Sequence, residues 1–593
     1  MMKLWRRFSE ERPAKASYHD YDVSVSHTAH AVLDASALVD DDAQAFDLSS
    51  SAPGKRTSTH EPAPADAALT PSTTHRTAYR THTQELLSGS HRLQWSTAAK
   101  GILCGVAAGL LVVAYRAAIA YGNSWAVGLY AFLAAHPLAI AGWAVAAILA
   151  AAAIAKLVTW EPMAAGSGIP QVEGVLLWGL KMRWWSILLV RFSAGIVCGF
   201  FGMSLGREGP SIQIGAAAAQ GVAAKLGRSR VEQENFIAAG AAAGLSAAFS
   251  APLSGMMFAL EEVYRSFSPV VLFTATTAAL TADFLSKLFL GFMPVLKFTA
   301  IAQMDLATYA WLVPLGVVSG LTGAAMNKLL LDMQTALGHL SAFWRILLAL
   351  ALALGVGLAF PLALGGGGSL IRFAEQGGGT MLLLAALLLV KMLFTATSFG
   401  SGVPGGIFLP ILTVGAVAGS LFARTMEFSL DQKYVSTFAV LAMAGALASS
   451  VKAPITSMLL VIEMSGSLVH MFPVAAVTLI SLLVSDALHV KPIYHALLDR
   501  YMAKNHPEKR ESTVDSGLMA LPVELGSSIL GKAIRDVAWP ADTQVVSVRR
   551  AGREFVPNAR TIIHPGDGLV VLYTGTNQRT AREALSVLCS AAY

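Results

Sequence analysis

Charged residues are scarce in this chain. Asp, Glu, Lys and Arg make up 13% of its 593 residues, 54% are hydrophobic, and the mean hydropathy is +0.56. Soluble globular proteins carry about 25% charged residues. The shortage excludes an ordinary soluble protein and indicates a polytopic protein of the lipid bilayer. The net charge of +6 then fits Lys and Arg retained on the cytoplasmic side better than nucleic-acid binding.

Cysteine and several signature motifs are also rare or missing. The three cysteines, Cys104, Cys198 and Cys589, lie too far apart to indicate a disulfide framework or a metal site, and we expect no cofactor. The sequence has no Thr-Val-Gly-Tyr-Gly filter, which argues against a potassium channel. It has no His-Glu-x-x-His motif and no Ser/His or paired-Asp constellation, which argues against an intramembrane enzyme.

Composition divides the chain into four parts. Residues 1–95 are polar and lack sustained periodicity, so we expect a disordered tail. Residues 96–499 hold a succession of apolar segments and are expected to form a transmembrane domain. Residues 500–515 are charged and polar, as in a linker. Residues 516–593 alternate short strand and helix patterns, which is typical of a small soluble α/β domain.

The apolar segments are unusual for membrane spans. Many are shorter than about 20 residues or are interrupted by Gly and Pro. Interrupted helices at bilayer depth are tolerated only where the backbone is buried in protein or lines a cavity. The pattern is therefore typical of a transporter or channel with broken helices. Examples are 137–159, 184–204, 236–260, 310–331, 380–398 and 437–465.

Two motifs repeat along the chain. The sequence Pro-Ser-Ile-Gln-Ile-Gly-Ala at 210–216 matches Pro-Ile-Leu-Thr-Val-Gly-Ala at 410–416, an offset of 200 residues. The sequence at 251–261, which starts with Ala-Pro and ends in Glu, matches 453–463 at an offset of 202. Motifs in the same order at nearly the same offset indicate two related halves of the chain.

These halves cover about 97–290 and 300–495 and are expected to meet at the functional site. Inversion of one half against the other is usual where discontinuous helices meet at the midplane. The predicted fold is therefore an all-α polytopic membrane protein with two related halves of broken helices. Their inversion is expected from this usual case, because the repeat alone does not show it. A small α/β soluble domain follows at the C-terminus.

Three apolar helices are predicted to begin with Gly-x-x-x-Pro, at 166–170, 206–210 and 406–410. The first N–H groups of a helix have no partner within it, and the helix dipole is positive there. Several such ends that meet at one point would bind an anion without a full positive charge nearby. Glu208 is itself an anion, so it could occupy the anion's place when ionised and leave it when protonated. One side chain would then couple a proton to an anion.

The three motifs read Gly-Ser-Gly-Ile-Pro, Gly-Arg-Glu-Gly-Pro and Gly-Ile-Phe-Leu-Pro. In this order they resemble the signature motifs of the CLC family of chloride channels and proton/chloride antiporters, and the resemblance covers about 97–500. It implies that Ser167, Ile407, Phe408 and Tyr494 coordinate a central chloride. It also implies that Glu208 is the external gating glutamate. Homodimers in a cell inner membrane, with both termini cytoplasmic, are a further implication of the resemblance.

A second glutamate bears on the choice between antiporter and channel. Antiporters of this family carry an internal proton-transfer glutamate at the position that Glu262 matches, whereas channels generally lack it. The resemblance therefore favours electrogenic chloride/proton antiport. A passive chloride channel gated by voltage or pH remains the alternative. Glu261 and Glu262 can also be interpreted as a helix-end ion pair with Arg265.

The C-terminal segment carries a second resemblance. The runs at 526–536, 548–553 and 563–572 resemble the C-terminal subdomain of regulators of potassium conductance, known as RCK_C. Such a module is expected to bind a small ligand, which the sequence does not name, or to dimerise. In chain order, the predicted elements of this domain are strand 518–525, helix 527–537, strands 544–549, 554–556 and 568–573, and helix 577–589.

Overall fold

The structure is a computed structural model that describes residues 74–590. Helix α3 (Thr74–Ala135) begins inside the segment expected to form a disordered tail, and residues 1–73 lie outside the described residues. Further short gaps in the description fall at 227–228, 266–267, 293–295, 297, 299–301, 303, 427–431, 469, 506–515, 551–552 and 575–577.

Apolar helices form the membrane region, as the composition predicts. Within the described residues, seven helical stretches are long and apolar enough to cross a bilayer. Large apolar side chains such as Leu382 and Phe284 are 81% and 63% exposed on them, as a surface that faces lipid requires. The stretches are Trp95–Ala135, Ala139–Trp160, Pro269–Leu290, Leu306–Leu337, Ala342–Ala359, Met381–Gly400 and Phe408–Thr425.

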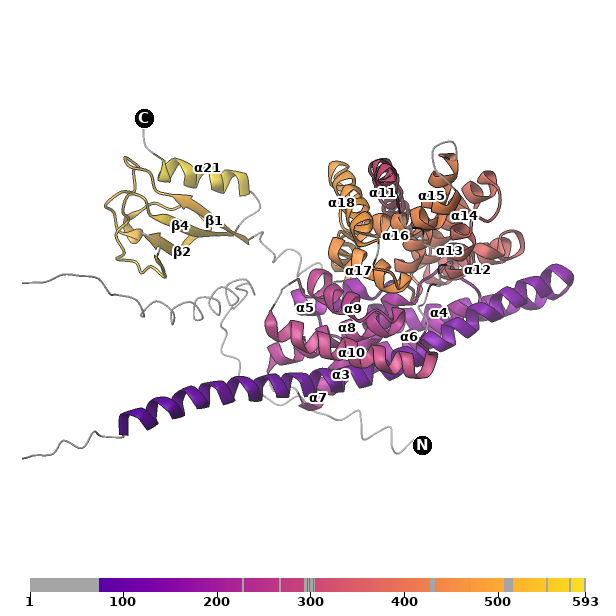
Figure 1. Ribbon diagram of the computed structural model, residues 1–593, viewed down its shortest axis with the longest axis horizontal. Helices are drawn as coiled ribbons and strands as arrows, with labels where there is room; N and C mark the ends of the chain where they lie inside the picture. Colours follow the sequence, from indigo (N-terminus) through magenta and orange to yellow (C-terminus); the bar gives the residue numbers. More distant parts are fainter. Residues whose placement is uncertain are drawn as a thin grey trace, which may run out of the picture. The chain divides into compact units, whose positions relative to one another are not determined.

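The helices form two groups in chain order, indigo to magenta and red to orange in Figure 1. The first group, with α3, comprises α4 (Ala139–Trp160), α5 (Ile169–Trp178), α6 (Trp184–Phe200), α7 (Glu208–Leu226), α8 (Arg230–Phe249), α9 (Pro252–Phe258), η2 (Ala259–Val263) and α10 (Pro269–Leu290). The second comprises α11 (Leu312–Leu337), α12 (Ala342–Ala359), α13 (Gly368–Glu375), α14 (Met381–Gly400), α15 (Phe408–Thr425), α16 (Val435–Val451), α17 (Pro454–Ser465), α18 (Met471–Ala487) and α19 (Ile493–Asn505).

The expected helix breaks are present and fall at equivalent places in the two halves. The apolar segment 236–260 breaks at Ser250 between α8 and α9, and 437–465 breaks at Lys452 between α16 and α17. Both residues have positive φ angles, 55° and 64°, which are uncommon for residues other than Gly. The sequence repeat is thus reproduced in backbone conformation as well as in motif.

Reciprocal bonds join the halves where these broken helices meet. Gly206 and Gly406 form an antiparallel bridge in which each N–H donates to the other's carbonyl, at 2.7 and 2.8 Å. Glu261 accepts hydrogen bonds from the N–H groups of Ile455 and Thr456 at 3.2 and 2.8 Å, at the start of α17.

Glu261 thus caps the start of α17, and the equivalent glutamate of the second half caps a helix start of the first half in the same way. Glu463 accepts from the N–H groups of Leu253 and Ser254 at 3.0 and 2.8 Å, at the start of α9. The glutamate of each half thus binds the equivalent helix start of the other half. Reciprocal contacts of this kind are typical of two units related by an approximate two-fold axis. The pattern agrees with the predicted pair of inverted halves.

The C-terminal domain is a small antiparallel sheet with one helix. Strands β1 (Ser516–Pro522), β2 (Thr543–Arg550), β3 (Arg553–Phe555) and β4 (Gly568–Thr574) lie in the order β1-β4-β2-β3. Helix α21 (Gln578–Cys589) follows the last strand. Leu585 and Cys589 of this helix belong to the same buried cluster as Leu569 and Val571 of β4. The strands and the last helix confirm the predicted α/β domain.

The helix predicted over 527–537 is wrong. Only the short turn η6 (Ile534–Asp536) is helical there. Gly526 and Gly531 adopt φ angles of 96° and 71°, which interrupt a right-handed helix. The segment instead forms an isolated bridge between Ala533 and Ile562. The apolar periodicity of this stretch therefore reflects burial of an irregular segment.

An ion pair connects the end of β2 to the turn that precedes β4. Nε and Nη2 of Arg550 donate to the two carboxylate oxygens of Asp567 at 2.8 and 2.7 Å, and the N–H of His564 donates to the same carboxylate at 2.8 Å. Burial acts to raise the pKa of Asp567, but these donors outweigh it and hold the pKa below its ordinary value. The carboxylate therefore stays ionised and keeps the turn closed.

Candidate functional site

The loop Gly166–Gly168 precedes α5 and presents Ser167 to the interior. Gly166 and Gly168 have φ angles of 64° and 95°, a region that Gly adopts readily and other residues avoid. The N–H of Gly405 donates to the carbonyl of Gly166 at 3.1 Å and ties the loop to the second half. Ser167 is 2% exposed, and its hydroxyl has no hydrogen-bond partner among the described residues. A buried hydroxyl of this kind is available as a donor to an anion.

Gly168→Ala tests whether this loop geometry is required. A Cβ on Gly168 would lie 2.7 Å from Nη2 of Arg191 and 2.9 Å from Cβ of Gln213. Because the φ angle also disfavours a side chain, we expect a loss of about 1–3 kcal/mol in stability. Thermal unfolding in detergent measures the loss. Gly142→Ala in α4, where a Cβ meets open space, is the control. Equal unfolding temperatures for the two variants would contradict the expected strain.

Glu208 is the first residue of α7 and is completely buried. Its carboxylate faces the backbone amides of Glu208 and Leu409, which belong to the first turns of α7 and α15. Neither oxygen makes a hydrogen bond of acceptable geometry with any described residue. A Cβ on Gly206 would collide with this carboxylate, so the glycine leaves room for the carboxylate in this position. The glutamate thus occupies the place where two helix starts converge.

Ile407 and Phe408 lie at the same junction. Ile407 is the N-cap residue of α15, and the two residues are 0% and 1% exposed. Their amides belong to the helix start, where N–H groups lack acceptors within the helix. The ring of Phe408 packs against those of Phe249 and Phe258, with centroid distances of 5.9 and 6.0 Å. These contacts hold the start of α15 in one position.

Tyr494 is the second residue of α19 and is fully buried. Its hydroxyl has no hydrogen-bond partner in the part of the chain that the structure describes. Helix α19 packs against α5, the helix that follows Ser167. Tyr494 is also near enough to both Glu208 and Glu262 to interact with them electrostatically. Tyr494 therefore adds a second unpaired hydroxyl to the interior that these glutamates share.

The sequence-predicted residues are brought together to different degrees. A Cβ on Gly209 would lie 2.6 Å from Oγ of Ser167 and 3.3 Å from Cα of Gly406, so the three motif loops touch one another. Ser167, Glu208, Ile407 and Phe408 thus share one junction. Tyr494 approaches from α19 through its packing on α5.

A buried arginine that no sequence motif indicates lies under the Ser167 loop. Arg191, in α6, is 0% exposed. It donates to the carbonyl of Gly166 at 2.6 Å and to Oε1 of Gln213 at 2.5 Å. A full positive charge thus lies under the Ser167 loop, in addition to the helix ends that are expected to bind the anion. These contacts direct the guanidinium at protein oxygens, so Arg191 holds the loop as well as supplying charge.

A cavity of about 690 Å³ opens beside the Ser167 loop. Ser167 lines it together with three cationic side chains, Arg345, Arg500 and Lys504. Among the described residues that line it, none is Asp or Glu. Such a one-sign lining concentrates anions and repels cations. The cavity is a candidate vestibule for an anion on its way to Ser167.

Glu262 lies in η2 and faces a different opening. It is 4% exposed and lines a cavity of about 360 Å³ with Arg265 and Lys452. Nη2 of Arg265 lies 3.8 Å from Oε1 of Glu262 and 3.0 Å from Oε1 of Glu173. The ion-pair interpretation is therefore correct for Glu262 and Arg265. Glu261 instead points at the start of α17, where it is a cap.

Two known families match the two parts of the chain. A sequence profile described as "Voltage gated chloride channel" matches residues 146–486, and one described as "TrkA-C domain" matches residues 518–586. The second match confirms the resemblance to an RCK_C-type domain.

Individual relatives agree with the first of these matches. The chain is 33% identical to the "H(+)/Cl(-) exchange transporter ClcA" of Cronobacter sakazakii over 433 residues, 69% of this chain and 90% of the relative. It is 32% identical to the protein of the same name from Salmonella typhimurium over 422 residues, 69% of this chain and 89% of that one.

A solved structure is similar as well. The crystal structure of "a slow cyanobacterial Cl-/H+ antiporter" superposes with a TM-score of 0.64 at 28% identity and covers 69% of this chain and 98% of that one. The motif loops, the paired helix starts and these matches lead to the same assignment. The chain belongs to the voltage-gated chloride channel family, the CLC family.

Proposed function

We propose that this protein exchanges chloride for protons across the membrane in an electrogenic cycle. Chloride binds between the hydroxyls of Ser167 and Tyr494 and the amides of Ile407 and Phe408. Glu208 alternates between blocking the anion path and carrying the proton. Glu262 passes protons between Glu208 and the opposite side. The relatives named as H(+)/Cl(-) exchange transporters support this proposal.

The position of Glu208 is the observation that carries the proposal. A fully buried carboxylate faces amides of two helix starts, where a halide would be stabilised. Burial of a charge without a strong partner is costly, so the carboxylate gains from leaving or from taking up a proton. An anion that moves along the path past Ile407 and Phe408 and the ionised glutamate compete for the amides of Glu208 and Leu409. This competition links anion movement to proton uptake.

The charges at the two openings add support. The cavity beside Ser167 is lined by cations, which suits an anion. Glu262 lines a separate cavity and lies within electrostatic reach of Tyr494. Separate openings allow the proton and the anion to reach the buried site by different routes. Coupling then takes place only where the routes meet, near Glu208.

A flux assay tests the function. Purified protein in lipid vesicles is given a chloride gradient, and proton movement is followed with a pH electrode. An antiporter drives protons against their own gradient. If the intact protein moves chloride but no protons, it is the passive chloride channel, gated by voltage or pH. In that case the ion pair of Glu262 with Arg265 would have a structural role only.

Glu262→Gln should abolish the uphill proton movement and leave chloride flux in place. Glutamine keeps the size of the side chain but cannot carry the proton. The measurement is the ratio of proton to chloride flux in the same vesicles. Glu261→Gln is a matched control, because it makes the same change one residue away on a side chain that caps α17. Equal loss in both variants would mean a structural defect, against the proton role of Glu262.

Further parts of the proposal concern assembly and location. We propose a homodimer in a cell inner membrane with both termini in the cytoplasm, each subunit with its own anion path. Residues 516–593 would bind a small ligand or dimerise. The TrkA-C match and the closed Arg550–Asp567 turn support a folded regulatory module.

A further inference from the structure

His495 follows directly after Tyr494 on α19. It lies at the edge of a cluster formed by Glu173, Arg265 and Glu262. The side chain of His495 is 37% exposed, whereas those of Glu173 and Glu262 are 0% and 5% exposed. Nδ1 of His495 lies 3.7 Å from Oε1 of Glu173. The histidine therefore joins a water-accessible surface to a buried carboxylate.

The buried carboxylates form a cluster around Arg265. Its Nη2 contacts Oε1 of Glu173 at 3.0 Å and Oε1 of Glu262 at 3.8 Å. Neither oxygen of Glu173, nor Oε1 of Glu262, has a hydrogen bond of acceptable geometry to a described residue. Two carboxylates that share one guanidinium are under-neutralised, and a proton on one of them relieves the repulsion. The cluster can therefore store a proton.

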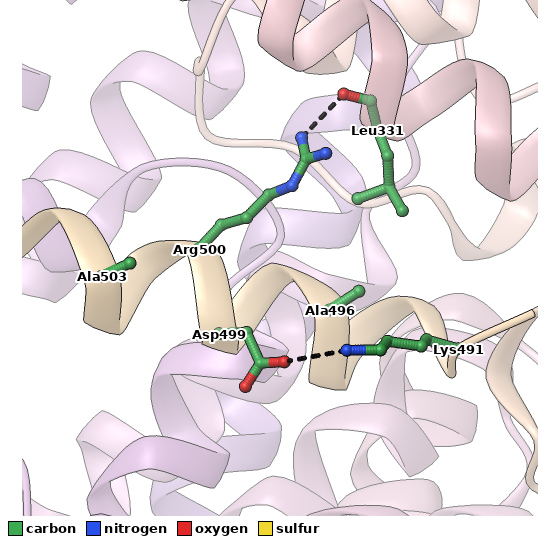
Figure 2. A pocket seen from close by; sticks show the side chains of 6 residues that line it. All are labelled: Leu331, Lys491, Ala496, Asp499, Arg500 and Ala503. Carbon is green, nitrogen blue, oxygen red and sulfur yellow. Dashed lines mark hydrogen bonds and ion pairs between the residues drawn. The ribbon is translucent and has the colours of Figure 1, made fainter. Parts of the chain in front are cut away.

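Two sides of α19 serve the two ions differently. Arg500 and Lys504 line the cationic vestibule beside Ser167. His495 and Asp499, four residues apart, approach each other at 4.0 Å between Nε2 and Oδ1. Figure 2 shows Asp499 directed at Lys491, 4.0 Å away, and Arg500 directed at the carbonyl of Leu331. One helix thus separates an anion-attracting face from a face with a titratable pair.

We propose that His495 transfers protons between water and the Glu173–Arg265–Glu262 cluster, which makes it the outer proton-transfer residue of the exchange cycle. This inference rests on the proposed function. The groups that face His495 are Glu173 of α5, Arg265 after η2, and Asp499 of its own helix, which in turn faces Lys491. Two carboxylates and a neighbouring guanidinium leave the ring able to gain and lose a proton near neutral pH.

The transfer balances in charge and atoms. A protonated imidazole gives its Nδ1 proton to Oε1 of Glu173, which leaves a neutral ring and a carboxylic acid. The acid passes the proton to Glu262 and becomes a carboxylate again. The neutral ring keeps its Nε2 proton, so the next proton from water binds Nδ1 after a ring rotation exposes that nitrogen. The separation of 3.7 Å is longer than a hydrogen bond, so a small ring rotation or one bridging water completes the contact.

A direct route from water to Glu262 would compete with this path. The cavity of about 360 Å³ reaches Glu262, and its lining includes the carboxylates of Glu261 and Glu262 as well as Arg265 and Lys452. The two cations offset the two carboxylates, so this entrance has no excess negative charge to attract a positively charged proton carrier. His495 offers an entry beside carboxylates instead. Loss of His495 decides between the two routes.

The test uses the full chain in vesicles, with the pH of each side set separately. In His495→Ala we expect uphill proton movement to fall about tenfold or more, most strongly when few protons are available on the His495 side. Imidazole added to that side should restore it, and imidazole on the other side should not. His495→Gln, which keeps the side-chain volume, should show the same loss. His136→Ala, in the exposed turn before α4, is the control and should behave like wild type.

Each outcome has a distinct meaning. A one-sided loss that imidazole rescues supports the proton role of His495. Unchanged proton flux in both His495 variants overturns it and favours the direct route to Glu262. A loss that imidazole does not rescue, together with loss of chloride flux, overturns it by showing a structural role. Absence of proton movement in the wild type removes the proposed function itself, and the wild-type trace reports this before any variant is compared.

Discussion

Replacing Glu208 with alanine should leave chloride moving and stop all uphill proton movement. The substitution removes the carboxylate that competes with chloride for the amides of Glu208 and Leu409. Without this competition the anion path is open at every pH, so chloride flux loses its pH dependence. The proton loses its carrier at the buried junction. Chloride and proton flux, measured together in vesicles across a series of pH values, give both readouts.

A second buried glutamate provides the control for this experiment. Glu161 is 3% exposed and is hydrogen-bonded by Ser186, with Arg183 3.2 Å away, and it lies outside the three motifs although it precedes Gly166 closely in the sequence. Glu161→Gln removes a buried charge in the same domain, and we expect both fluxes to stay coupled. A Glu208→Ala protein that folds but carries no chloride would contradict the gating role.

Arg191→Met should cost about 3 kcal/mol in stability and weaken chloride binding at least about tenfold. The substitution keeps a long apolar chain but leaves the carbonyl of Gly166 and Oε1 of Gln213 without their buried donor. Buried acceptors that lose a charged partner pay the full cost of desolvation. The Ser167 loop then loses its support. Calorimetric chloride titration and thermal unfolding in detergent measure the two effects.

An exposed arginine near the start of the same helix is the control for Arg191. It tests whether the expected losses in stability and chloride binding come from the burial of Arg191. Arg183 pairs with Glu161 at 3.2 Å, but its side chain is 60% exposed. The guanidinium of Arg183 is thus largely in solvent, and Ser186 still donates to the buried Glu161 after the substitution. Arg183→Met should therefore unfold close to the wild-type temperature and bind chloride normally. If both methionine variants bind chloride equally well, Arg191 does not support the site.

The sequence alone predicts much of the scaffold. The repeat between 210–216 and 410–416 anticipated two halves, and the structure adds that they exchange bonds between Gly206 and Gly406. The Gly-x-x-x-Pro motifs located the three helix starts because glycine tolerates the turn before a helix and proline favours its first turn. Local patterns of this kind depend on neighbours in the chain, which a sequence displays directly.

The supporting residues could not be predicted in the same way. Arg191 lies far along the chain from Gly166, and nothing local indicates that its guanidinium turns inward to that carbonyl. His495 becomes notable only when α19 packs against α5 and brings Glu173 near it. The helix wrongly predicted at 527–537 has the same cause, a contact between distant parts of the chain. This segment is irregular because its backbone pairs with Ile562 and Ile563, which the local sequence does not indicate. Contacts between distant segments carry the missing information.

The paired glycines at the centre limit how the molecule can change shape. Tilting one half against the other would break both bonds between Gly206 and Gly406, and with them the caps that Glu261 and Glu463 provide. Many transporters expose their sites alternately by this kind of rocking. Here the backbone is fastened where such a pivot would lie. Under the proposed exchange, turnover would then depend on the movement of a few side-chain atoms and on the arrival of protons, and we expect cross-linking of the two halves to be tolerated.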